Sequence, residues 1–156
     1  MSFLILGRHG QSTWNLEKRL TGGVDVDLTK KGESEAEKAG LGIKEKNIES
    51  DFYYSYIQLR ANNKLKIIQT ALNDKKTFST AWQLSERHYV ALTGLNKIEM
   101  SEKIGENKLL EFRISWDVKP YALNKESPYH PINIETYKNI PREVLPETEA
   151  SKDTYE

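Results

Sequence analysis

The sequence predicts an α/β protein, in which a mostly parallel sheet carries helices on both faces and the whole forms three layers. Two observations favour this class. Short apolar segments at residues 3–6, 52–55 and 77–80 are typical of strands, and amphipathic stretches of helical period alternate with them. The order β-α-β-α-β implies right-handed crossovers and parallel strands. A chain of 156 residues is the size of one domain, so we expect a single domain over residues 1–156.

The first strand is expected at Phe3–Leu6, because its continuous apolar run suits a strand covered on both faces. A loop over residues 20–28 follows, and Thr29 is suited to cap a helix over residues 30–44. Small residues recur along this helix at helical spacing, so that face is expected to approach the sheet closely. They are Gly32, Ala36, Ala39 and Gly40.

The second strand is expected at residues 52–55, and the second helix at residues 59–72. An apolar stripe marks that helix. It consists of Ala61, Leu65, Ile68 and Leu72. A third strand is expected at residues 77–80, and helical patterns resume near residues 98–104 and 109–116. All 5 prolines lie between Pro120 and Pro146, so residues 117–156 are predicted to be an irregular, extended tail.

Composition limits the classes of partner. The 23 basic residues balance the 23 acidic ones, which argues against nucleic acid as the main partner. There are no cysteines, and the three histidines, His9, His88 and His130, are far apart in the sequence, so no metal site is expected. No run approaches the roughly 18 apolar residues of a membrane span. We therefore expect a cytoplasmic protein without a membrane partner.

The segment that follows the first predicted strand carries the chemistry. A histidine at the carboxyl end of a buried strand lies where open α/β sheets place their ligands, and His9 has this position. Arg8 offers a planar set of donors for a phosphate, and Gly10 lets the backbone come close to a ligand. Further hydroxyl and amide groups follow near a possible helix start, where free N–H groups favour an anion. These groups belong to Ser12, Thr13 and Asn15.

Residues 8–15, Arg-His-Gly-Gln-Ser-Thr-Trp-Asn, resemble the R-H-G-x-S-x-W-N signature of cofactor-dependent phosphoglycerate mutases in the histidine phosphatase superfamily. The resemblance implies a phosphoryl group carried on His9, 2,3-bisphosphoglycerate as the donor that primes it, and no metal. It makes Arg8 a catalytic clamp. It also implies substrate contacts for the rest of the segment, namely Gly10, Gln11, Ser12, Thr13, Trp14 and Asn15.

A second match surrounds Arg60. Residues 51–61 align without a gap on the strand, turn and helix that supply the family's second phosphate-binding arginine, which makes Arg60 a catalytic residue by resemblance. Three positions depart from the family's pattern. Ser55-Tyr56 stands in place of Thr-Ser, and Leu59 in place of Lys.

A third match covers residues 86–97. Glu86-Arg87-His88-Tyr89 resembles the family's E-R-H-Y block, and residues 91–97 resemble its A-L-x-G-L-N-K block. The resemblance makes Glu86 the proton donor and acceptor. Arg113 resembles the first of a pair of arginines whose second member is Ile114 here. The substrate contacts implied by resemblance, in addition to residues 10–15, are Thr21, Gly22, Arg87, His88, Tyr89, Lys97 and Arg113.

The implied function is interconversion of 3-phosphoglycerate and 2-phosphoglycerate in glycolysis and gluconeogenesis, with small phosphorylated three-carbon acids as partners and a possible homo-oligomer. The resemblance extends to residues 145–154, where the family continues into a part that contains a second His-Gly. His9-Gly10 is the chain's single His-Gly pair, so we expect a C-terminally truncated domain with impaired activity. The alternatives are a catalytically inactive remnant, a phosphate-binding module and a general histidine phosphatase. The E-R-H-Y block favours the mutase over the phosphatase.

Overall fold

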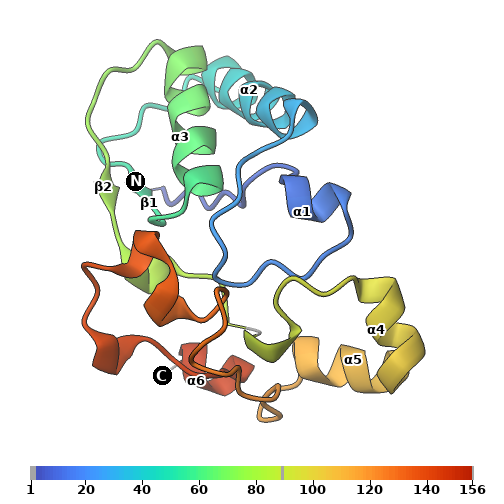
Figure 1. Ribbon diagram of the computed structural model, residues 1–156. Helices are drawn as coiled ribbons and strands as arrows, with labels where there is room; N and C mark the ends of the chain where they lie inside the picture. Colours follow the sequence, from blue (N-terminus) through green and yellow to red (C-terminus); the bar gives the residue numbers. More distant parts are fainter. Residues whose placement is uncertain (1–2, 89, 156) are drawn as a thin grey trace.

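The computed structural model describes residues 3–88 and 90–155 and shows helices with a small parallel sheet, which confirms the α/β class (Figure 1). The helices are α1 (Thr13–Leu16), α2 (Lys30–Glu45), α3 (Leu59–Leu72), α4 (Lys97–Ile104), α5 (Glu106–Ile114) and α6 (Ser151–Tyr155). The strands are β1 (Tyr54–Ser55) and β2 (Ser79–Thr80). Helices α2 and α3 lie side by side at one end of the molecule, and α4 and α5 lie at the other (Figure 1).

The sheet confirms the second and third predicted strands in shortened form. Strands β1 and β2 are parallel, with Tyr54 opposite Ser79 and Ser55 opposite Thr80. Helix α3 connects them, as expected for a β-α-β unit. Helix α3 begins and ends at the predicted residues.

The prediction of a strand at Phe3–Leu6 was wrong. The structure assigns no strand to these residues, and their side chains are exposed, at 74% for Phe3, 82% for Leu4 and 84% for Leu6. An apolar run forms a buried strand when a neighbouring strand pairs with its backbone and other layers cover both faces. Within residues 3–88 and 90–155, the sheet contains β1 and β2 alone, and this segment has neither kind of cover.

Helix α2 confirms its predicted start, but its small residues do not face the sheet as expected. The Thr29 side chain accepts a hydrogen bond from the Gly32 N–H and so caps the helix. A methyl group at Gly32 would lie 2.1 Å from the Gln11 carbonyl oxygen, and one at Gly40 would lie 2.7 Å from the Ala71 Cβ. The small face therefore packs against the segment after His9 and against α3.

A compact apolar cluster joins α5 to two loops. It is formed by Leu20, Leu92, Leu109 and Phe112, with Met100, Ile104 and Val118 packed against it. Helices α4 and α5 also pack against each other. Because Leu20 precedes the predicted substrate loop and α4 begins at Lys97, burial of this cluster brings two predicted site segments to one side of the molecule.

The proline-containing tail folds back on the molecule in compact 3₁₀ turns in place of the extended chain that we expected. The turns span Pro131–Asn133, Glu135–Tyr137 and Arg142–Val144. Tyr137 is buried at 2% exposure, and its hydroxyl donates to the Gly23 carbonyl at 2.7 Å. The tail thus contributes directly to the packing around the loop at residues 21–24. In the described part of the chain, no helix is long and apolar enough to cross a membrane.

Candidate active site

His9 lies where the exposed N-terminal segment meets α2, and its ring orientation fixes which nitrogen is available. Its Nδ1 atom lies 2.7 Å from the Gly10 carbonyl oxygen. A carbonyl oxygen can accept a hydrogen bond but cannot donate one, so Nδ1 carries the proton of the neutral ring. The lone pair of that ring is then on Nε2, which is the atom that can act as a nucleophile.

The surroundings of His9 favour the neutral imidazole. Burial lowers the pKa of His9 below its ordinary value, because removing water disfavours the charged ring. The Gly10 carbonyl opposes this shift, the charges of Arg60 and Arg8 add to it, and the Glu86 carboxylate opposes it. His9 is therefore close enough to Arg8, Arg60 and Glu86 for their charges to act on its ring. This environment holds the ring unprotonated at neutral pH, as a nucleophile requires.

Arg60, in the first turn of α3, is 1% exposed and is held from three directions. Its Nη1 donates to the Val24 carbonyl at 2.8 Å, and its Nη2 donates to the Gly22 carbonyl at 3.1 Å. The same Nη2 lies 3.3 Å from Oε2 of Glu86. A buried guanidinium is tolerated when several acceptors satisfy it, and here they also fix its orientation.

Lys97 and Arg113 extend the positive charge. Burial lowers the pKa of Lys97, the nearby charges of Arg113 and Arg8 add to the lowering, and Glu86 opposes it. Four cationic side chains thus share a region with one carboxylate. We call Arg8, Arg60, Lys97 and Arg113 the cationic cluster. Such a group of like charges is stabilised by a bound anion, whereas a metal ion would add to the repulsion.

The predicted substrate loop lies beside Arg60. Thr21 and Gly22 are buried, and Gly22 adopts φ of +50°, a left-handed conformation that glycine takes without a steric cost. Its carbonyl points to the Arg60 guanidinium. The loop and the arginine are therefore parts of one arrangement.

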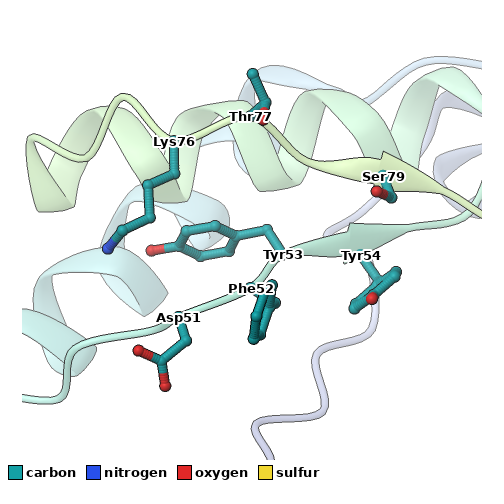
Figure 2. A pocket seen from close by; sticks show the side chains of 7 residues that line it. All are labelled: Asp51, Phe52, Tyr53, Tyr54, Lys76, Thr77 and Ser79. Atoms are coloured by element: carbon teal, nitrogen blue, oxygen red, sulfur yellow. The ribbon is translucent and has the colours of Figure 1, made fainter.

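A hollow of about 350 Å³ lies elsewhere, along β1 and β2 (Figure 2). It is lined by Asp51, Phe52, Tyr53, Tyr54, Lys76, Thr77 and Ser79, none of which is a predicted site residue. The Tyr53 hydroxyl donates to Asp74 at its border. The candidate site is therefore assigned from the chemistry around His9 and not from the shape of this hollow. Among the described residues, no group of three or more His, Asp or Glu side chains is arranged to bind a metal.

Comparison with known proteins agrees with this chemistry. The family model of the histidine phosphatase superfamily (branch 1) matches residues 4–130, which is most of the chain. The chain belongs to the histidine phosphatase superfamily.

Two curated relatives of this superfamily member are named 2,3-bisphosphoglycerate-dependent phosphoglycerate mutase. That of Pelagibacter ubique (strain HTCC1062) is 63% identical over 156 residues, which cover 100% of this chain and 66% of the relative. That of Borreliella burgdorferi (strain ZS7) is 46% identical over 156 residues, which cover 97% of this chain and 61% of the relative. The chain therefore spans 61% to 66% of the length of these relatives.

A solved structure confirms the fold. The phosphoglycerate mutase from Bacillus anthracis str. Sterne superposes with a TM-score of 0.59 at 23% identity, over 67% of this chain and 48% of that chain. The elements of this chain therefore have the arrangement of a phosphoglycerate mutase-like α/β protein.

Several residues of the signature at 8–15 have structural partners within the chain. A methyl group at Gly10 would lie 2.5 Å from the Gly32 carbonyl, so Gly10 permits the close approach of α2. Ser12 is fully buried and forms a capping box for α1 with Asn15. Trp14 packs edge-on to Tyr129, with the Arg19 guanidinium over its ring. These contacts of residues 10–15 fix the backbone around His9.

Gln11 and Thr13 also hold the backbone after His9. The Gln11 N–H donates to Glu35 at 2.9 Å, and its carbonyl accepts from the Thr29 N–H at 2.9 Å. The Thr13 N–H donates to the Asp27 carbonyl at 3.1 Å, while its side chain is exposed.

The predicted E-R-H-Y block is divided. Glu86 joins the site through Arg60. The Arg87 guanidinium donates to the Phe112 carbonyl at the end of α5 and to the Ser151 hydroxyl of α6, so it ties these helices together. His88 is buried against Tyr137 at 5.7 Å between ring centroids. Tyr89 lies outside the described residues.

Sequence reasoning missed the side chains that hold the site's backbone. Lys64 of α3 donates to the Arg8 carbonyl, and the amide of Gln58 and the hydroxyl of Tyr137 contact the Gly23 carbonyl. Gln58 and Tyr137 are 79 positions apart, so no local pattern could pair them.

Proposed function

We propose that this protein is a phosphoglycerate mutase that interconverts 3-phosphoglycerate and 2-phosphoglycerate through a phosphorylated His9. The observation that carries the proposal is the 63% identity, over the whole chain, with a protein named 2,3-bisphosphoglycerate-dependent phosphoglycerate mutase. The position of His9 among Arg8, Arg60 and Glu86 supports it. On this proposal, the substrates are small phosphorylated three-carbon acids, and the reaction belongs to glycolysis and gluconeogenesis.

The cationic cluster fits 2,3-bisphosphoglycerate, which carries two phosphates and a carboxylate. Beside His9, the charges of Arg8 and Arg60 outnumber that of the Glu86 carboxylate. Lys97 adds positive charge near Arg8, and Arg113 lies near Lys97. Arginine is suited to phosphate oxygens because its planar donors can bind two of them at once. We propose that Arg8, Lys97 and Arg113 hold the molecule, and that the buried Arg60 adds its positive charge and holds Glu86 in place. When bound, the molecule supplies the phosphoryl group that primes His9.

The residues of the chain then divide the work of transfer. The Nε2 lone pair of His9 forms the nitrogen–phosphorus bond as the ester oxygen leaves with a proton from Glu86. The other ring proton stays on Nδ1, which donates it as a hydrogen bond to the Gly10 carbonyl. In the return step, a substrate hydroxyl attacks the phosphorus and Glu86 takes its proton, while the nitrogen–phosphorus bond breaks and its electron pair returns to Nε2 of His9. Guanidinium groups stabilise the charge that spreads over the phosphoryl oxygens, so positioning supplies most of the catalysis.

Turnover measured with two readouts tests the proposal. The protein is incubated with 3-phosphoglycerate and a small amount of 2,3-bisphosphoglycerate, and phosphorus NMR follows 2-phosphoglycerate and free phosphate together. We expect 2-phosphoglycerate to form faster than free phosphate, and His9→Ala to abolish both. Release of phosphate without 2-phosphoglycerate would identify a general histidine phosphatase. Binding of 3-phosphoglycerate with neither product would identify a phosphate-binding module, and either result contradicts the mutase.

A further inference from the structure

Three consecutive carbonyl groups of the loop beside Arg60 are held by side chains. The Gly22 and Val24 carbonyls accept from Arg60, at 3.1 and 2.8 Å. Between them, the Gly23 carbonyl accepts from Nε2 of Gln58 and from the Tyr137 hydroxyl, both at 2.7 Å. These hydrogen bonds fix the loop and the arginine relative to each other. None of them was predicted from the sequence.

The Gly23 carbonyl oxygen accepts as many hydrogen bonds as it can. A carbonyl oxygen has two lone pairs, and Gln58 and Tyr137 use both. The Tyr137 hydroxyl donates its one proton to Gly23, so it must accept from Gln58 at 2.9 Å and from the Tyr56 hydroxyl at 2.7 Å. The Tyr137 hydroxyl then has one possible role, and its proton and the Gln58 amide together fix the direction of the Gly23 carbonyl.

Burying the polar Gln58 side chain costs free energy, which indicates that its N–H donors are needed at this position. Gln58 is fully buried, and its Oε1 finds no partner among the described residues. An apolar side chain of similar size would avoid that cost. Burial also raises the pKa of Tyr137 to about 12, so its hydroxyl keeps the proton that it donates at all physiological pH values.

We propose that Gln58 and Tyr137 are positioning residues, which fix the Gly22–Val24 loop and the Arg60 guanidinium in one arrangement beside the site of a phosphorylated ligand. The identity of that ligand rests on the proposed function, but the fixing of the loop does not. Neither residue touches the ligand; each acts through the Gly23 carbonyl.

Two phenylalanine variants test the proposal as a matched pair. Tyr137→Phe removes the hydroxyl that reaches Gly23, whereas Tyr56→Phe removes a neighbouring buried hydroxyl that contacts Tyr137 and not the loop. Gln58→Leu serves as a second variant of the positioning pair. The dissociation constant for 3-phosphoglycerate, amide hydrogen exchange at residues 22–24 and the midpoint of urea unfolding are measured for each protein.

We expect Tyr137→Phe to weaken binding of 3-phosphoglycerate about fivefold and to speed exchange at residues 22–24 by a similar factor, as loss of one buried hydrogen bond predicts. Gln58→Leu should act in the same direction. Tyr56→Phe should change the unfolding midpoint without changing either local readout. Equal effects of Tyr137→Phe and Tyr56→Phe on binding and exchange would overturn the proposal.

The design separates the two proposals. If the unmodified protein does not bind 3-phosphoglycerate, the proposed function fails. The positioning role is then decided by hydrogen exchange alone, in which Tyr137→Phe must exceed Tyr56→Phe at residues 22–24.

Discussion

The ring of His9 has one nitrogen engaged and one available, and this division underlies the proposed chemistry. The Gly10 carbonyl holds the proton on Nδ1, so a phosphoryl group can be received on Nε2 without a change of tautomer. The lowered pKa of His9 keeps Nε2 unprotonated as the pH falls below the ordinary value of 6.5. The same cationic groups that lower this pKa are suited to bind the phosphate.

His88 gives a pH prediction for stability. Burial lowers its pKa to about 4 from the model-compound value of 6.5, and the charge of His130 adds to the shift. The unfolded chain therefore binds a proton more readily than the folded protein between these two values. The contribution of His88 to the free energy of unfolding should be fully present above pH 6.5. It should decrease by about 3 kcal/mol as the pH falls to 4.

Urea unfolding at pH 7 and at pH 4.5, for the unmodified protein and for His88→Gln, checks this prediction. The variant should lose most of the pH dependence and keep a smaller part from His9 and His130, whose pKa values burial also lowers. A variant with the same pH dependence as the unmodified protein would show that His88 is not the responsible group.

At the scale of elements, α2 supports the site through its small residues. The Gly32 backbone lies so close to Gln11 that a side chain at position 32 would displace the segment that carries His9. Gly42, in the same helix, has nothing within 4 Å of the position where a methyl group would be added. The two glycines therefore form a matched pair.

We expect Gly32→Ala to destabilise the protein by about 1–3 kcal/mol, because the methyl group would overlap with the Gln11 backbone. Gly42→Ala should stabilise it by up to about 1 kcal/mol, because alanine favours a helix interior. Chemical denaturation measures both effects. Equal stability of the two variants would contradict the close packing of α2 on residue 11.

The sequence was sufficient to predict α2 and α3, because the cap of α2 and the periodicity of both helices are local. The Thr29 side chain caps α2 as predicted, and Leu59–Leu72 has the predicted bounds. It was insufficient for Phe3–Leu6, because an apolar run does not say which strand pairs with it. Helix ends could be predicted where the residues that set them are close in sequence. The sheet could not be predicted, because strands pair with residues far away in the sequence.

The same distinction applies to the candidate site at the scale of the whole molecule. Resemblance to short motifs selected His9, Arg60 and Glu86, and the structure brings these residues together. Arg87 lies in an equally strong motif, yet its guanidinium donates to the end of α5. Motifs identified the chemical groups, whereas tertiary packing decided which way each side chain points.

The exposed segment at residues 3–6 and the folded tail also belong to this scale. The apolar side chains of residues 3–6 lie in solvent, whereas the proline-rich tail supplies the buried Tyr137. Local composition would have assigned these two segments the opposite burial. The packing of the whole molecule, and not local hydrophobicity, positions the loop beside Arg60.

Transfer of labelled phosphate to His9 tests the central claim most directly. The protein is incubated with 2,3-bisphosphoglycerate labelled in its phosphates, and the labelled residue is located after proteolysis. We predict a label that is stable in alkali and labile in acid, located on His9 and absent from His9→Ala. A folded protein that remains unlabelled, or that carries the label on His88 or His130, would contradict the claim that His9 is the phosphate carrier.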